Sequence, residues 1–447
     1  MPTPSPLWRR LQIWRRRSAP DIQQPLDVMG RRVATGLGAV LLGLIALAFA
    51  QAGDQAQRAF DRLVAAWPYA PLVLTPAIFA GVMFLTRRWS PDARGSGIPQ
   101  VIAATRNPET AARGPLISIR TAVAKFGLTI AMLFAGGSVG REGPTVQISA
   151  AVMVAVHRLL RVPISAGVLI AGGAAGVAAA FNTPLAGVAF AIEELAAAYE
   201  QRVAVLVMGA VMVAGLVSLG IAGDYVYFGA MRQTLTVAAM ILACPVAGII
   251  GGVAGGLFTR VVLSFAAPKH PLLTRLRSRP VLLAAACGLV VALLGLVTGG
   301  STWGTGYHTT RILVEGEQSS LWFGPAKALA TLATTLSGTP GGIFAPSLAV
   351  GAGVGNLLTP IFPGSPAGAV VLLGMVAYFT GVVRAPLTAV IIISETTASR
   401  GMIIPLFATA LIADSVSALI SRERLYHGLA KPFLAAAKTE QTSPPRP

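Results

Sequence analysis

The sequence predicts an all-α polytopic membrane protein, and three observations support this. The 447 residues are 54% hydrophobic and only 12% charged, with a mean hydropathy of +0.70, which is unusual for a soluble domain. Apolar runs long enough to cross about 30 Å of hydrocarbon recur along the chain. Glycine and proline interrupt many of them. The clearest runs are Val33 to Ala50, Trp67 to Leu85, Val203 to Ala222, Leu235 to Leu257 and Pro280 to Val297.

The chain starts with a basic stretch that does not lead into an apolar run. Five arginines between positions 9 and 17 are followed by the polar stretch 21–27. This order does not match a cleavable secretion signal. We therefore expect residues 1–32 to form a basic segment that the protein retains.

The net charge of +18 comes from 35 Lys and Arg residues against 17 Asp and Glu residues. In a soluble protein this excess would suggest a nucleic-acid partner, but here it lies beside apolar runs, so the expected partner is the lipid bilayer and no nucleic acid. The stretch Gln51 to Ala65, expected to be a loop, balances two acids with two bases. The positive-inside rule then predicts an external 51–65 loop and cytoplasmic N- and C-termini. The basic clusters are Arg9 to Arg17, Arg31 to Arg32, Arg87 to Arg94 and Arg422 to Lys438.

Two local features predict packing without chemistry. Cys244 and Cys287 each lie inside an apolar run, where a small buried side chain is expected and neither a disulfide nor a metal site is implied. Gly248, Gly252 and Gly256 are spaced by four residues, which predicts one face of a helix packed closely on a neighbour.

An internal repeat is found at an offset of 202 residues. The segment Gly140 to Thr145 aligns with Gly342 to Ser347, and Thr183-Pro184-Leu185 aligns with Ala385-Pro386-Leu387. Glu193 and Glu395 match at the same shift. The repeat predicts two equivalent halves, about 33–225 and 232–425, and such halves are often inverted in transporters with the substrate site where they meet.

Breaks inside apolar runs carry a functional implication. A broken helix in lipid leaves backbone N–H and C=O groups without partners, which is tolerated only where the break is buried in protein or faces a polar cavity. The many glycines and prolines within the runs are therefore typical of a transporter.

Three glycine- and proline-rich segments look like helix starts: Gly95 to Pro99, Gly140 to Pro144 and Gly341 to Pro346. Proline is favoured in the first helical turn, and the preceding glycines allow a close approach of the backbone to a ligand. A helix N-terminus offers free N–H donors and about half a positive charge. Three of them aimed at one point would bind an anion weakly enough to release it again.

These segments read GSGIP, GREGP and GGIFAP, and they resemble the signature motifs of the CLC family of chloride channels and chloride/proton exchangers. The resemblance extends from about Val33 to Leu434. It implies a CLC-type fold with a transmembrane domain over 33–437, a final helix at about 423–437, a cytoplasmic tail at 438–447, and a homodimer with one pore per subunit. No metal and no organic cofactor are implied; the transported ions would be chloride and protons.

The resemblance also implies the chloride ligands. Ser96 would offer its hydroxyl, Ile343 and Phe344 their backbone N–H groups, and Tyr426 its phenol from the last helix. Two alternatives remain open: Ser96 as a helix cap, and Tyr426 as an aromatic anchor at the membrane interface. The supporting motif positions are Gly95, Gly97, Pro99, Gly140, Arg141, Gly143, Pro144, Gly341, Gly342 and Pro346.

Glu142 lies in the second motif and is exposed to opposed influences. Helix N-termini favour its charged form, whereas desolvation and a bound anion favour its neutral form. By resemblance it is the external gating glutamate, which blocks the path when charged, accepts a proton, and swings away. The alternative is a structural ion pair with Arg141 or another basic residue.

Glu193 and Glu194 follow the apolar run Pro184 to Ile192. Two acids at the end of a helix usually form a solvated interface, and that alternative stays open here. The surrounding stretch resembles the CLC family, in which the second acid matches the internal proton-transfer glutamate of the exchangers. Glu194 is therefore expected to accept protons.

Coupled exchange and passive conduction are the two functions that compete within the family. Glu194 favours chloride/proton exchange because channels of the family typically lack this acid; a voltage- or pH-gated chloride channel is the alternative. Ser96 favours chloride over nitrate, since nitrate-preferring relatives tend to carry proline at that position. The intact Gly143-Pro144-Thr145 argues against the fluoride-specific branch. The short C-terminal tail is consistent with a bacterial inner-membrane protein.

A serine hydrolase is the hypothesis from another class, because Gly136 to Gly140 matches the G-x-S-x-G pattern around Ser138. That pattern requires a strand-to-helix elbow and a positioned histidine. Ser138 instead follows an apolar, helix-like run, and none of the four histidines lies in a recognisable triad segment.

Overall fold

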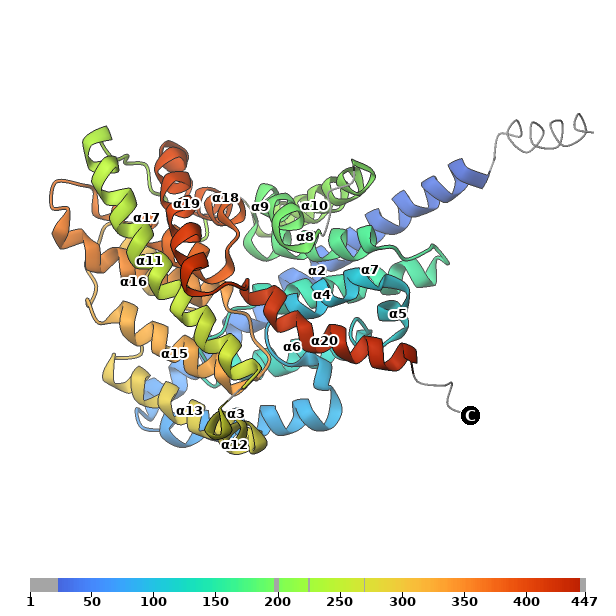
Figure 1. Ribbon diagram of the computed structural model, residues 1–447, viewed down its shortest axis with the longest axis horizontal. Helices are drawn as coiled ribbons and strands as arrows, with labels where there is room; N and C mark the ends of the chain where they lie inside the picture. Colours follow the sequence, from blue (N-terminus) through green and yellow to red (C-terminus); the bar gives the residue numbers. More distant parts are fainter. Residues whose placement is uncertain (1–22, 197–200, 224–225, 269, 443–447) are drawn as a thin grey trace, which may run out of the picture.

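The computed structural model describes residues 23–196, 201–223, 226–268 and 270–442, and these fold almost entirely into helices (Figure 1). In these ranges the one β-type pairing is an antiparallel bridge between Gly140 and Gly342. The α-helices are α2 (Gln23–Ala66), α3 (Pro71–Trp89), α4 (Ile98–Arg106), α5 (Pro108–Arg113), α6 (Ile119–Phe134), α7 (Glu142–Leu159), α8 (Ala166–Phe181), α9 (Pro184–Phe190), α10 (Gln201–Ala222), α11 (Val237–Ala266), α12 (Pro271–Ser278), α13 (Pro280–Val297), α14 (Tyr307–Val314), α15 (Phe323–Ser337), α16 (Phe344–Leu358), α17 (Ala367–Val383), α18 (Pro386–Thr397), α19 (Ile403–Ile420) and α20 (Leu425–Thr442).

The predicted all-α polytopic architecture is confirmed. Among the described residues, 7 helices are long and apolar enough to cross a membrane. The five apolar runs of the sequence coincide with α2, α3, α10, α11 and α13. Several other apolar helices are too short to cross on their own, as the frequent glycine and proline breaks predict.

One prediction about local structure is wrong: residues 51–65 are not a loop. Helix α2 continues without a break to Ala66. The charged residues of this stretch support the helix at i,i+4 spacing, since Gln57 donates to Asp61 at 3.2 Å and Arg58 Nε donates to the carbonyl of Asp54 at 3.2 Å. The C-terminal helix also continues past its predicted end, to Thr442.

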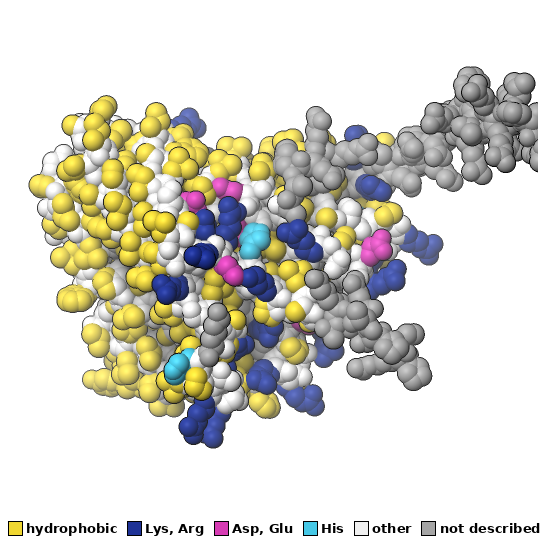
Figure 2. Space-filling model, viewed as in Figure 1, with side chains coloured by type: hydrophobic (Ala, Val, Ile, Leu, Met, Phe, Trp, Pro, Cys, Tyr) yellow, Lys and Arg dark blue, Asp and Glu magenta, His cyan; other side chains and the backbone are white. Residues whose placement is uncertain are grey.

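The helices form two groups with a buried centre. In Figure 1, α11 and α15 to α19 lie on one side and α2 and α4 to α10 on the other, and α20 crosses in front. Helices α7, α8, α16 and α17 are buried on nearly every face, whereas α2, α10, α11 and α13 expose many large apolar side chains. This apolar exterior is the surface expected to face lipid. Figure 2 shows it on the side of α11, with Lys and Arg side chains gathered near α20.

Helix α11 packs against two neighbours through glycine. A Cβ built on Gly248 or Gly252 would lie 2.8 Å from atoms of α19, and one on Gly256 would lie 3.1 Å away. On the adjacent face, a Cβ on Gly255 would lie 2.6 Å from the backbone of Gly381 in α17. The predicted close packing of the 248–256 ridge is therefore confirmed.

Two helix breaks near the centre have the same construction. Helix α8 ends at Asn182 with φ 58°, and α17 ends at Arg384 with φ 62°. In each case a proline two residues later, Pro184 or Pro386, starts the next helix. A left-handed residue followed by proline is a common helix stop. The two breaks lie 202 positions apart, which matches the offset of the repeat.

The short helices after these breaks exchange carboxylate caps. Glu193 accepts hydrogen bonds from the N–H of Leu387 at 3.0 Å and of Thr388 at 2.7 Å, at the start of α18. Glu395 accepts one from the N–H of Ala186 at 2.8 Å, at the start of α9. Each acid thereby satisfies N–H groups that have no partner in their own helix and lie at its positive end. The predicted boundaries of the two halves remain a prediction, although these paired contacts support the repeat.

The glycine packing leads to a stability prediction. We expect Gly255→Ala to lower the free energy of unfolding by about 1–3 kcal/mol, because the added methyl overlaps the backbone of α17. Gly209→Ala on α10 is the matched control, since a Cβ there meets nothing within 4 Å. Thermal unfolding in detergent should show a lower Tm for Gly255→Ala and no loss for Gly209→Ala. Equal Tm values for both variants would contradict the packing argument.

Candidate functional site

The three glycine-rich segments meet at the centre of the molecule. Helices α4, α7 and α16 begin within them, at Ile98, Glu142 and Phe344, as the sequence predicts. The segments are hydrogen-bonded to one another: Gly341 N donates to Gly95 O at 3.1 Å, and Gly140 and Gly342 exchange two bonds of 2.7 Å. Three helix N-termini are thus fixed side by side in a buried region, where their free N–H groups favour an anion.

Ser96 and Tyr426 present hydroxyls to this region. Tyr426 is fully buried and Ser96 nearly so. The two side chains interact with one another, but within the described part of the chain neither hydroxyl makes a hydrogen bond of ordinary geometry. Both line a cavity of about 550 Å³ together with Ile343. Buried hydroxyls without a protein partner are uncommon, and they fit a site whose partner is a ligand.

The two alternatives left open for these residues do not match the geometry. The N-cap of α4 is Gly97, with φ 106°, and no side chain caps this helix, so Ser96 is not a helix cap. Tyr426 has no exposed surface and its ring lies 5.9 Å from that of Phe344. It therefore does not act as an anchor at the membrane interface.

Ile343 and Phe344 start α16. Ile343 is its N-cap and Phe344 its first residue, so their N–H groups are among those that lack an intrahelical partner. The Phe344 ring is fully buried, with the Phe379 ring at 5.0 Å and the Phe190 ring at 5.8 Å. This aromatic packing fixes the direction of the helix start.

A buried lysine holds the loop of Ser96. Lys125 Nζ donates to the carbonyl of Gly95 at 2.7 Å and to that of Arg94 at 3.3 Å. Gly95 and Gly97 have φ values of 61° and 106°, which glycine adopts without strain. Nothing in the local sequence around Lys125 indicates that its side chain reaches this loop.

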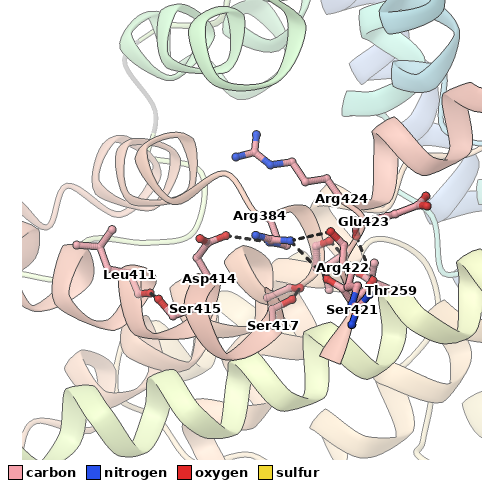
Figure 3. Close-up of polar contacts among 12 residues, drawn as sticks. Thr259, Arg384, Leu411, Asp414, Ser415, Ser417, Ser421, Arg422, Glu423 and Arg424 are labelled. Atoms are coloured by element: carbon pink, nitrogen blue, oxygen red, sulfur yellow. Dashed lines mark hydrogen bonds and ion pairs between the residues drawn. The ribbon is translucent and has the colours of Figure 1, made fainter. Parts of the chain in front are cut away.

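The start of α20, and with it Tyr426, is fixed by Arg384. Figure 3 shows the Arg384 side chain between Asp414 and the backbone that precedes α20. Its Nε lies 3.1 Å from the Asp414 carboxylate, and its Nη1 donates to the carbonyls of Ser421 at 3.4 Å and Arg422 at 3.5 Å. These contacts connect α17, α19 and the turn before Tyr426.

Glu142 is fully buried at the start of α7. One carboxylate oxygen accepts a hydrogen bond from the Tyr307 hydroxyl, and the other accepts one from the N–H of Ala345 at 3.4 Å. The neighbouring Arg141 points elsewhere, with Nη1 at 2.7 Å from Asp54. Glu142 therefore makes no direct ion pair with Arg141. Its contact with Tyr307 could not be predicted from the local sequence.

Glu194 lies in a π-helical turn, Ala191–Leu195, after α9. Its side chain is 0% exposed, and the Nδ1 atom of His427, whose side chain is 39% exposed, lies 3.3 Å from its carboxylate. This burial does not match a solvated pair of acids at an interface. The adjacent Glu193 instead caps the N-terminus of α18. The contact with His427 was not foreseen from the sequence.

Ser138 has a structural environment. It is buried, and its hydroxyl is 2.9 Å from that of Thr331. Its hydrogen-bond partner in the described chain is Thr331 and not a histidine. It also follows a helix, α6, whereas a nucleophile elbow follows a strand. The geometry gives no support to a hydrolase.

A comparison with known families identifies the chain. The family model for voltage-gated chloride channels, CLC, matches residues 77–418, which is more than half of the chain. The chain belongs to this family. The resemblance seen in the sequence motifs is thereby confirmed, and the chain is a membrane transport protein of the CLC family.

Solved structures show the same fold. A slow cyanobacterial Cl⁻/H⁺ antiporter matches with a TM-score of 0.76 and 23% identity, covering 91% of this chain and 98% of the other. A eukaryotic CLC transporter matches with a TM-score of 0.73 and 21% identity, covering 90% and 74%. A CLC-type fluoride/proton antiporter matches with a TM-score of 0.74 and 21% identity, covering 90% and 98%. At these identities the comparison establishes the CLC fold.

The role of Arg384 can be tested with Arg384→Gly, which removes the side chain but suits the left-handed backbone at this position. We expect the free energy of unfolding to fall by about 1–3 kcal/mol, because the turn before α20 loses its charged donor. Chloride binding measured by calorimetry should weaken with it, since Tyr426 follows this turn. The control is Arg311→Ala, which breaks an exposed i,i+4 pair with Glu315 and should change little. Unchanged stability and chloride affinity in Arg384→Gly would contradict this role.

Proposed function

We propose that this CLC protein is a secondary active transporter that exchanges chloride for protons across a membrane. The observation that carries the proposal is the meeting of three helix starts in the buried centre of the molecule, beside a cavity that the hydroxyl residues Ser96 and Tyr426 line. Two buried carboxylates accompany it: Glu142 at the start of α7, and Glu194, which contacts His427 of α20. Such a site can hold an anion and pass protons.

Chloride is the proposed anion, bound by Ser96, Ile343, Phe344 and Tyr426. Hydroxyl and backbone N–H donors bind it without a full counter-charge, so the ion can leave again. The apolar rings beside Phe344 suit a weakly hydrated anion. Ser96 supports chloride over nitrate, as in the family pattern.

Glu142 is proposed as the external gate and proton acceptor. Its carboxylate lies 3.4 Å from the N–H of Ala345, at the start of α16, so in its charged form it occupies a place where an anion would be stabilised. When it takes up a proton, this attraction weakens. The side chain then swings away and chloride can pass.

Glu194 is proposed as the internal proton station. It is buried, and its contact with the partly exposed His427 supports a proton route from the water-facing surface to the carboxylate. This second titratable carboxylate, beside α20, is the reason to favour exchange. A passive voltage- or pH-gated chloride channel of the same family is the alternative.

The remaining parts of the proposal follow from the family and from the charge pattern. We propose a homodimer with one pore per subunit, cytoplasmic termini, and a place in the bacterial inner membrane. The transported ions are chloride and protons, and no cofactor or metal takes part.

A liposome experiment tests the exchange. With a chloride gradient imposed on purified, reconstituted protein, we expect the wild type to drive protons uphill. Glu142→Ala and Glu194→Gln should each abolish this proton movement while chloride flux continues, because each removes one proton station.

Two further results would contradict parts of this proposal. Chloride flux without proton movement in the wild type would assign the protein to the channels. Glu193→Gln is the control for Glu194→Gln, because Glu193 is the neighbouring acid and caps α18; it should keep proton coupling. Loss of coupling in both variants would argue against a specific role for Glu194.

A further inference from the structure

Tyr307 is the side chain that contacts the proposed gate and belongs to none of the three motifs. It is the first residue of α14, and its hydroxyl donates to a carboxylate oxygen of Glu142. Glu142 has no exposed surface. Tyr307 also lines a second cavity of about 960 Å³, on the side of the molecule where α2 ends. The phenol therefore lies between this cavity and the carboxylate.

The position of Tyr307 is fixed by the turn before it. Gly304 and Gly306 have φ values of 63° and 85°, and Lys327 Nζ donates to the carbonyls of Gly304 at 2.7 Å and Thr302 at 2.9 Å. The sequence Gly304-Thr305-Gly306 is built like Gly95-Ser96-Gly97, with two left-handed glycines and a buried lysine behind the first. Lys125 and Lys327 are 202 positions apart. The same device that holds Ser96 thus holds Tyr307.

Aromatic contacts fix the ring itself. The Tyr227 ring lies at 4.6 Å and 90° to it, and the Phe228 ring at 5.5 Å and 65°. These edge-to-face contacts favour one ring orientation. Both the backbone and the ring of Tyr307 are restrained. Its hydroxyl therefore keeps its position whether or not Glu142 is bound, and little conformational entropy is lost when the hydrogen bond forms.

The other charged and titratable groups near the gate are differently engaged. The Arg141 guanidinium lies 5.8 Å from the ring centres of both tyrosines, donates to the hydroxyl of Tyr227 at 2.7 Å and pairs with Asp54. Lys327 donates to the turn before Tyr307, and Tyr426 lines the other cavity together with Ser96. Tyr307 is thus the side-chain donor that reaches Glu142.

We infer that Tyr307 is a latch that holds Glu142 in the closed, charged position and thereby sets the pH at which the path opens. The inference rests on the proposed role of Glu142 as the gate. A phenol–carboxylate hydrogen bond is charge-assisted and weakens once the acid is protonated. The hydrogen bond from Tyr307 therefore opposes protonation of Glu142 and slows exchange at higher pH. When Glu142 takes up a proton, the bond weakens and the side chain can leave the closed position. Tyr307 is a positioning residue, since it acts through Glu142.

The test is Tyr307→Phe, which removes the hydroxyl and keeps the ring contacts. Chloride efflux from liposomes is recorded from acidic to neutral pH. We expect the activation midpoint to move to higher pH by about one to two units, because a hydrogen bond to the charged acid is lost. Above the wild-type midpoint the flux should rise about tenfold or more. Tyr378→Phe is the control, a buried tyrosine on α17, and should leave the midpoint in place.

A double variant separates a latch from a general loosening of the fold. In a Glu142→Gln background, which has no carboxylate to hold, Tyr307→Phe should leave the flux and its pH profile unchanged. A chain carrying 3-fluorotyrosine at 307, a more acidic phenol and stronger donor, should shift the midpoint the other way, to lower pH. This second measurement applies even if the phenylalanine variant folds poorly.

Two different failures can be told apart. If Glu142→Gln alone keeps the pH dependence and proton coupling of the wild type, the proposed gate is wrong. If Glu142→Gln loses both but Tyr307→Phe and the fluorotyrosine chain keep the wild-type midpoint, the gate stands and the latch is overturned. A shift of equal size in the Glu142→Gln background would also overturn it.

Discussion

The structure depends on one constraint: in a membrane, the free N–H groups at the start of a helix must find partners inside the protein. Helices α4, α7 and α16 start at the centre, and their glycine loops hydrogen-bond to one another. Glycine is required there because a side chain would fill the shared space; a Cβ on Gly143 would lie 2.4 Å from Ser96 Oγ. What remains unpaired is a set of donors around a small pocket, and this is what makes the site suitable for an anion.

The donors are useful only if they are rigid, and buried lysines supply part of that rigidity. Lys125 and Lys327 each direct their amine at two carbonyls of a glycine turn. Buried polar side chains in a membrane protein are costly and persist where they satisfy backbone groups or serve function. Here each lysine holds a turn open on one side of the pathway, one beside Ser96 and the other beside Tyr307.

Much of the fold and the motif-based part of the site could be predicted from the sequence. Hydropathy located the long helices, and the pattern of glycine and proline located the starts of α4, α7 and α16, because both are local properties of the chain. The balanced charges of residues 51–65 also occur in loops, but here they support helix α2 at i,i+4 spacing, and local composition does not distinguish the two cases. Tyr307, Lys125 and His427 were missed for another reason: the contact of Tyr307 with Glu142 spans 165 positions, and no local pattern marks such a partner.

The reciprocal caps between α9 and α18 limit how this protein can move. Glu193 and Glu395 each bind the other half of the sequence, since one half runs from α2 to α10 and the other from α11 to α19. The Gly140–Gly342 pair also connects the two halves. Swinging one group as a rigid body against the other would break all of these bonds, at about 0.5–1.5 kcal/mol each or more where a carboxylate is left buried. Alternating access by rocking is therefore disfavoured in this architecture. The cheaper motion is the rotation of single side chains within an otherwise stationary frame.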